Sequence, residues 1–169
     1  MRKLLILVVP AVFLFAYCGS APKVEKPNPD AAAAVKDRGF DTAELKVKGL
    51  NSKLSSVSLK GFPSWGSKVD SSKWDLWAKL SAPAVNAVAK EVPDGYVLQI
   101  TGHATKAGSK SRNLSVSKKR AKYVWSSLKK QGLKTDKITY KGVGYSEPID
   151  ENDPTNPENR RVSFKIVKK

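Results

Sequence analysis

Apolar and polar positions in the second half of the chain follow two different periods, which predict strands and helices in succession. The apolar run at residues 96–100 follows a Pro-Asp-Gly turn and is typical of a buried strand. A helix is predicted from about residue 113 to 131, because four side chains recur there with helical spacing: Ser117, Ala121, Val124 and Leu128. Gly132 follows as a helix-ending glycine.

Two further strands are predicted near the C-terminus. The first covers Ile138 to Gly142. A polar loop over residues 147–158 leads to the second, which alternates between an apolar and a polar face. Its apolar face carries Val162, Phe164 and Ile166.

The first half of the chain is less regular. Imperfect alternation over residues 45–62 predicts one or two strands. A short helix is predicted to start at Ser71 or Ser72, and Pro83 is predicted to open another helix, since a proline loses nothing in a first turn. The order β–α–β–α–β–β indicates an α+β sandwich, with one mixed sheet covered by helices.

Three tryptophans lie close together in sequence, at Trp65, Trp74 and Trp77. Aromatic side chains so close in sequence could form a platform for carbohydrate, but they more often fill a core, and the core interpretation is favoured here.

The N-terminus has the order of an export signal. A basic start at residues 1–3 precedes an apolar run over residues 4–16, well short of the roughly 20 residues that span a membrane. The only cysteine, Cys18, follows directly, so no internal disulfide is expected. The surrounding residues resemble a bacterial lipoprotein processing box. Tyr17 stands where such boxes usually carry a small residue, although looser boxes occur in some bacterial groups, spirochaetes among them.

Residues 1–18 are therefore predicted to be a lipoprotein signal peptide, with Cys18 acylated (with palmitate or a similar chain) and anchoring the mature chain. The alternative is a free thiol at the cleavage point. Residues 19–35 are rich in Pro and Ala and have no amphipathic period, which predicts a tether. Residues 36–169 are left to form the folded domain.

The charge of the chain bears on its partners rather than on its fold. It carries 31 Lys and Arg against 15 Asp and Glu, a net charge of +16. An exported protein meets anions other than nucleic acid, so no nucleic acid is expected as partner. The candidates are peptidoglycan carboxylates, lipopolysaccharide phosphates, anionic lipid headgroups and acidic host glycans.

The sequence argues against an enzyme. His103 is the only histidine, and it has no cysteine partner because Cys18 belongs to the export signal. Zinc-protease, nucleophile-elbow and P-loop motifs are absent, as is metal-ligand spacing. The acidic residues at 150, 151 and 153 lack the register of a calcium loop. No metal or cofactor is predicted.

Four separated motifs remain. Residues 102–108 read GHATKAG, residues 113–121 read NLSVSKKRA with Val124 beyond, residues 142–148 read GVGYSEP, and residues 159–162 read NRRV. In this order and spacing, they resemble the motifs GHTDxxG, NxxLSxxRAxxV, GxGxxxP and NRRV of the OmpA-like family. The resemblance covers residues 95–167.

The resemblance implies non-covalent binding of the peptidoglycan stem peptide through its diaminopimelate side chain. In the family, an arginine pairs with the carboxylate of this zwitterion and an aspartate accepts its ammonium. Carried over by position, Arg120 is that arginine, Asn113 is a polar contact, and Arg160 or Arg161 gives support. The alternatives are structural: Arg120 as a solvated flank or in an internal ion pair, Asn113 as a helix cap, and the other arginines as edge-strand charges. His103 is expected to be a structural loop residue.

Thr105 occupies the position of the family aspartate, and no carboxylate lies between residues 102 and 123. Loss of one partner of a buried charge pair costs about 2–5 kcal/mol, so diaminopimelate recognition is expected to be weaker and more salt-sensitive. The predicted function is an outer-membrane lipoprotein that faces the periplasm and tethers the membrane to peptidoglycan, with surface exposure as the alternative location. The alternative function is a basic binding module for anionic envelope or host glycans.

Overall fold

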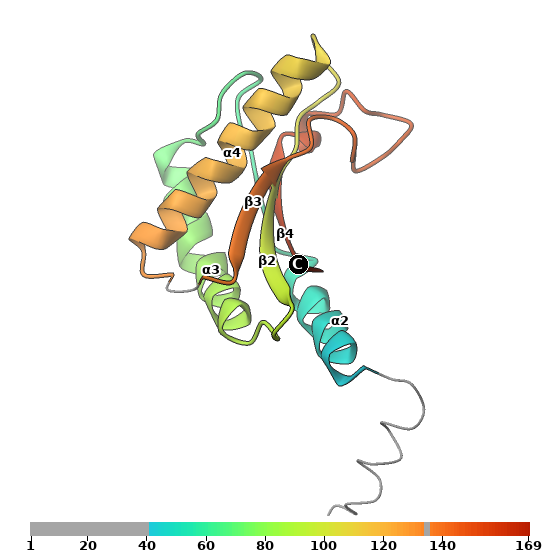
Figure 1. Cartoon of the computed structure of the whole chain (residues 1–169). Helices are drawn as coiled ribbons and strands as arrows, with labels where there is room; N and C mark the ends of the chain where they lie inside the picture. Colours follow the sequence, from blue (N-terminus) through green and yellow to red (C-terminus); the bar gives the residue numbers. More distant parts are fainter. Residues whose placement is uncertain (1–40, 134–135) are drawn as a thin grey trace, which may run out of the picture.

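A computed structural model describes residues 41–133 and 136–169 (Figure 1). The predicted signal peptide, Cys18 and the tether over residues 19–35 lie outside the described residues. Within the described part, no helix is both long enough and apolar enough to cross a bilayer.

The described residues form one mixed four-stranded sheet in the order β1-β4-β2-β3. Strands β2 and β3 are parallel, whereas β4 runs antiparallel to both β1 and β2. The predicted α+β class is therefore confirmed. In chain order, the elements are α2 (Thr42–Leu54), β1 (Ser58–Lys60), α3 (Ser71–Lys90), β2 (Tyr96–Gly102), α4 (Lys110–Lys130), β3 (Ile138–Gly142), the 3-10 helix η1 (Pro157–Asn159) and β4 (Arg161–Lys168).

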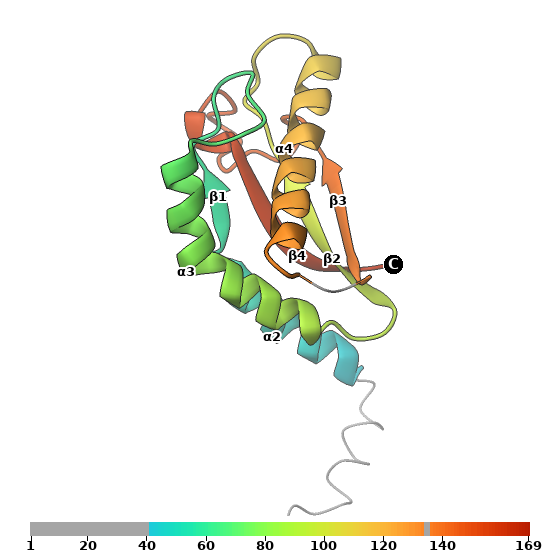
Figure 2. The same ribbon diagram turned by 90° about the vertical axis from the view of Figure 1, so that its left-hand side faces the viewer.

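Helices α3 and α4 lie on the same side of the sheet (Figures 1 and 2). The alternation predicted for the last strand is confirmed, because the three side chains of its predicted apolar face are buried. Two of them pair in register with apolar side chains of β2, Phe164 with Ile100 and Ile166 with Leu98. Burial of these two strands under the helices forms the core. The apolar contacts of β2 and β4 with the helices fix the end of β2, where the next loop begins.

The prediction of strands over residues 45–62 is wrong for most of that segment, since Thr42–Leu54 is helix α2. The side chain of Asp41 caps it by accepting a hydrogen bond from the Ala43 N–H at 2.8 Å. Leu50 and Leu54 are buried four residues apart, a spacing that also fits imperfect alternation. The Asn51 amide extends the edge of the sheet, because it donates to the Ile166 carbonyl at 3.0 Å and accepts from its N–H at 2.7 Å.

The predicted helix boundary at Pro83 is also wrong, because α3 continues through it. Pro83 lies on the exposed side, while Ala82 and Val85 beside it are buried. Packing of both flanking turns compensates for the single backbone hydrogen bond that a proline removes. The helix is capped by Asp70, one residue before the predicted serines, through a hydrogen bond from the Ser72 N–H at 2.9 Å.

The tryptophans divide between two environments. Trp77 is buried and stacks on Phe164 with ring centroids 5.7 Å apart, and Trp74 packs against Trp77 at 5.3 Å. The core interpretation is therefore confirmed for these two. It is wrong for Trp65, which is 42% exposed on the loop between β1 and α3.

Candidate functional site

The ends of β2 and β3 pass directly beneath α4, where there is no room for a side chain. A Cβ atom on Gly102 would lie 1.9 Å from the Ser117 carbonyl oxygen, and one on Gly142 would lie 2.2 Å from the Lys118 nitrogen. These two glycines are paired in the parallel register of β2 and β3. The first and third motifs therefore supply glycine where helix and strands meet, and this contact positions the loop that follows β2.

Hydrogen bonds join the motif loops to one another. Ser117 Oγ accepts from the Gly144 N–H at 2.9 Å and donates to the Leu114 carbonyl. The Ala104 N–H donates to the Gly144 carbonyl at 2.7 Å. Gly144 has a φ of +62°, which favours glycine at this position. The motifs thus form one connected cradle around the start of α4.

His103 is a buried structural residue, as predicted. It is 2% exposed, and its Nε2 lies 2.8 Å from Ser163 Oγ. Burial lowers the pKa of His103 to about 3, and the positive charges of Arg161 and Lys141 add to the effect, while a backbone carbonyl at Glu147 opposes it. The folded protein therefore holds this imidazole in its neutral form at physiological pH.

The stability of the domain should fall in acid because of His103. His103 takes up a proton near pH 6.5 in the unfolded chain but only near pH 3 in the folded chain. The stability that the neutral His103 contributes is therefore complete above pH 6.5 and is lost as the pH falls towards 3. At pH 4.5, the loss should be about 2.5 kcal/mol, at about 1.4 kcal/mol per pH unit. Urea unfolding at pH 7 and pH 4.5 measures it.

The control for this measurement is His103→Gln, which keeps a polar group near Ser163 but does not titrate. The carboxylates titrate in both proteins, so the difference between the two pH dependences isolates the histidine. An equal loss of stability in both proteins would show that His103 contributes none of it.

Arg120 is fully buried, and its guanidinium is held by backbone carbonyls. It donates to four of them, over 2.6–3.2 Å: Gly66, His103, Pro63 and Ser64. Burial, together with the nearby charge of Arg160, lowers the pKa of Arg120 to about 10, so it remains a cation at neutral pH. No ion pair of Arg120 occurs in the described part of the chain. The solvated-flank and ion-pair alternatives are therefore both wrong.

Three of these four carbonyls belong to the segment 63–66, hereafter the covering loop. Arg160 secures the residue before it, since its Nε donates to the Phe62 carbonyl at 2.8 Å. Arg161 is directed elsewhere and donates to the Glu147 carbonyl at 3.2 Å. Two of the three predicted arginines thus hold the covering loop in place.

Asn113 is buried inside α4, so the alternative interpretation of this residue as a helix cap is wrong. The helix starts at Lys110, and Ser109 caps it by accepting from the Arg112 N–H. Asn113 Nδ2 instead donates to the Ala107 carbonyl at 2.6 Å and to the Ser109 carbonyl at 3.1 Å. Thr105 is 7% exposed in the same loop. The cradle thus contains the predicted loop and helix residues, with a neutral side chain at the position expected for an acid.

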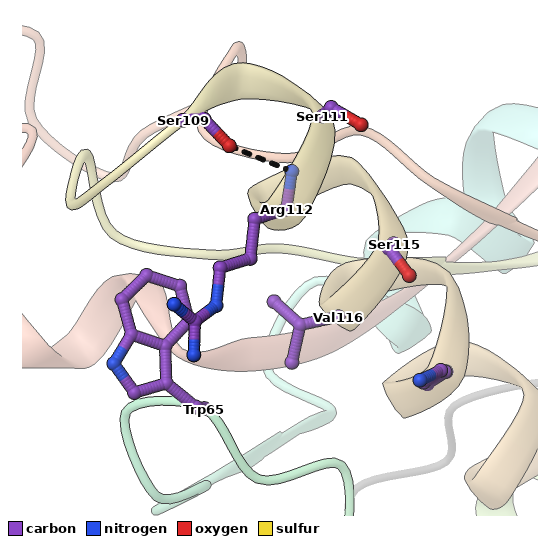
Figure 3. Close-up of a pocket in the computed structure, with 7 residues that line it drawn as sticks. Trp65, Ser109, Ser111, Arg112, Ser115 and Val116 are labelled. Carbon is purple, nitrogen blue, oxygen red and sulfur yellow. Dashed lines mark hydrogen bonds between the residues drawn. The ribbon is translucent and has the colours of Figure 1, made fainter.

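An open pocket of about 410 Å³ lies beside the covering loop (Figure 3). The guanidinium of Arg112 lies 4.0 Å from the centre of the Trp65 ring and forms one wall with it. Sequence reasoning missed this pocket. The available signal was a tryptophan inside a turn-rich Pro-Ser-Trp-Gly stretch, where core packing is not expected. The lining residues are Trp65, Ser109, Ser111, Arg112, Ser115, Val116 and Lys119.

Residues 78–161 match the model of the OmpA family, which covers all four motifs up to Arg161. The chain therefore contains an OmpA-family domain, and the predicted resemblance is confirmed. Comparison with curated protein sequences gives no match. In the described residues, no group of three or more His, Cys, Asp or Glu side chains is arranged to hold a metal ion.

Solved structures with this fold come from several bacteria. The peptidoglycan-associated lipoprotein of Burkholderia pseudomallei is 20% identical, with a TM-score of 0.53 over 72% of this chain and 99% of that one. The OmpA-like domain of FopA1 from Francisella tularensis is 24% identical, with a TM-score of 0.50 over 65% and 69%. The C-terminal domain of Helicobacter pylori MotB is 14% identical, with a TM-score of 0.52 over 66% and 84%. At these identities, the likeness supports the fold alone.

Proposed function

We propose that this protein is a cell-envelope lipoprotein whose OmpA-family domain associates non-covalently with peptidoglycan. The observation that carries the proposal is the cradle, in which hydrogen bonds join the first three family motifs around the start of α4. The fourth motif is connected to the first, because the His103 N–H donates to the Arg161 carbonyl at 2.9 Å. One of the proteins that share the fold is named for its association with peptidoglycan. The surface chemistry agrees, because α4 carries seven exposed Lys and Arg residues and no acid: Lys110, Arg112, Lys118, Lys119, Lys122, Lys129 and Lys130.

The proposed peptidoglycan contacts are Thr105, Asn113, Arg120, Arg160 and Arg161. Two features are expected to weaken diaminopimelate specificity. Thr105 brings no charge for the ammonium, and the covering loop accepts three of the four hydrogen bonds of Arg120. A stem-peptide carboxylate can reach Arg120 only if the covering loop moves away. Binding should therefore depend more on general charge, which salt screens.

The N-terminal part of the proposal is a lipid anchor. Acylation of Cys18 would hold the domain at the outer membrane, facing the periplasm, with residues 19–35 as a tether. An extended stretch of that length reaches about 50 Å at about 3.3 Å per residue, which gives the domain room to meet the cell wall. No catalytic role is proposed.

Thr105→Asp is expected to increase peptidoglycan binding at physiological salt by at least about tenfold, because it restores the family's charge partner for the ammonium. The measurement is co-sedimentation of the mature lipoprotein with diaminopimelate-type sacculi, at low salt and at about 0.15 M salt. The matched control is Thr105→Asn, which is similar in size but has no charge. A wild-type protein that stays in the supernatant at both salt concentrations would contradict the proposal.

A second candidate function is supported by the same basic helix. The protein could bind anionic envelope or host glycans through α4 without a specific peptidoglycan site. It predicts that Thr105→Asp weakens sedimentation, since the substitution lowers the net positive charge. The sign of the Thr105→Asp effect therefore separates the two functions.

A further inference from the structure

Trp65 is fixed in place although it is exposed. The end of its ring lies against Gly108, where an added Cβ atom would be only 2.9 Å from Trp65 Cη2. Arg112 lies over its face at 4.0 Å from the ring centre. The indole therefore stands between the covering loop and α4 as a wall, and tryptophan is enriched at binding surfaces because one end of its ring is apolar and the other carries a hydrogen-bond donor.

The charges around this wall have one sign. Arg112 and Lys119 both line the pocket, no acidic side chain does, and neither cation forms an ion pair within residues 41–133 and 136–169. Three serine hydroxyls and the side chain of Val116 complete the lining. A pocket with two unpaired cations and an apolar wall suits an anion that also carries small apolar groups.

The pocket and the buried Arg120 are connected through the covering loop. Its backbone carbonyls occupy the Arg120 guanidinium, and its Trp65 side chain forms the wall of the pocket. The guanidinium of Arg120 inside the cradle is thereby covered, while Arg112, about two turns earlier on α4, lines the open pocket. The volume of about 410 Å³ falls in the range of small-ligand pockets.

We propose that this pocket binds a carboxylate of the peptidoglycan stem peptide. Arg112 pairs with the carboxylate through its planar fork, Lys119 neutralises a second carboxylate, and Trp65 with Val116 contacts alanine methyl groups. A peptide fits better than a phosphate polymer, because the pocket offers a single guanidinium fork beside an apolar wall instead of a row of cations. The inference rests on the proposed function and assigns its specificity chiefly to Trp65 and Arg112, which lie outside the family motifs.

The test titrates the full mature chain in detergent with soluble stem pentapeptide. NMR follows the Trp65 indole N–H signal and, so that Trp65→Ala can also be measured, the backbone N–H signals of Ser111 and Lys119 in the pocket lining. Arg112→Gln and Trp65→Ala should each weaken binding by about tenfold or more, the effect of losing a charge-assisted hydrogen bond or a buried aromatic contact. The matched control is Lys122→Gln, which removes one charge from the exposed side of α4 without lining the pocket. It should change the affinity by less than about twofold.

An equal loss of affinity in Arg112→Gln and Lys122→Gln would overturn the inference, because general charge would then explain binding. So would sacculi that bind while the pentapeptide leaves the Trp65 signal unmoved. That second result would leave the proposed function standing. Failure of both sacculi and pentapeptide to bind would remove the proposed function together with the pocket.

Discussion

Replacing Gly102 by alanine is expected to lower the free energy of unfolding by about 4 kcal/mol or more. The added methyl carbon would lie 1.9 Å from the Ser117 carbonyl oxygen, which is less than the contact distance of any two heavy atoms. Backbone lies on both sides of this contact, so no side chain can rotate away. Helix α4 must move off the sheet, and the core loses packing along its length.

Chemical denaturation followed by circular dichroism measures this effect, with Gly49→Ala as the control. Gly49 lies in α2, and a Cβ atom there would meet nothing within 4 Å. Alanine is favoured over glycine inside a helix, so this variant should gain up to about 1 kcal/mol. If Gly102→Ala were as stable as the wild type, α4 would not lie as close to β2 as described.

Replacing Arg120 by methionine is expected to cost about 3–5 kcal/mol of stability, the second large effect, because it breaks a buried hydrogen-bond network. Methionine fills much of the same space but leaves four carbonyls, three of them in the covering loop, without their donor. A buried acceptor without a partner costs about 1–3 kcal/mol. The total for four carbonyls stays below four times this value, because the carbonyls of a released covering loop can bond to water. The covering loop should therefore detach from the cradle, and Trp65 should become mobile.

Urea unfolding and the fluorescence anisotropy of Trp65 measure the two parts of this effect, with the other tryptophans replaced by phenylalanine as a common background. The matched control is Lys122→Met, since Lys122 is exposed on α4 outside the pocket and its loss should cost no more than about 0.5 kcal/mol. Unchanged stability in Arg120→Met would mean that the covering loop does not depend on this arginine.

The same variant separates two roles of Arg120 in peptidoglycan association. If Arg120 only holds the covering loop, sedimentation of Arg120→Met with sacculi should follow its folded fraction as urea is added. If Arg120 also contacts the stem peptide after the covering loop moves, the folded variant should already bind sacculi more weakly than the wild type in the absence of urea. The comparison needs no further variant, because the sedimentation curve and the unfolding curve are measured on Arg120→Met and on the wild type under the same conditions.

Local sequence patterns predicted the elements whose faces repeat with one clear period. Strand β4 and helix α4 carry regular apolar positions, and both form as expected, apart from an earlier start of α4 at Lys110. The glycines at 102 and 142 could also be placed from sequence, as parts of family motifs. Their physical reason, the contact with α4, is visible only when helix and strands are assembled.

Two elements were mispredicted where the local pattern is ambiguous. Apolar residues near Leu50 fit both alternation and helical spacing, and packing of α2 against α3 and β4 decides for the helix. Pro83 is a helix breaker by its own chemistry, yet buried neighbours on both sides carry α3 through it. In both cases, tertiary contacts outweigh a weak local preference.

The sequence by itself determined the fold class, the four motifs of the OmpA family and the basic character of α4. It also showed that Thr105 stands where the family has an acid. Only the tertiary structure decided that Arg120 is closed off and Arg112 left open. The carbonyls of the covering loop come from residues 54–57 positions away in the sequence, and their approach depends on the packing of the whole core. Residues far apart in the sequence determine the surroundings of a charged side chain, and the local pattern of apolar and polar residues does not predict them.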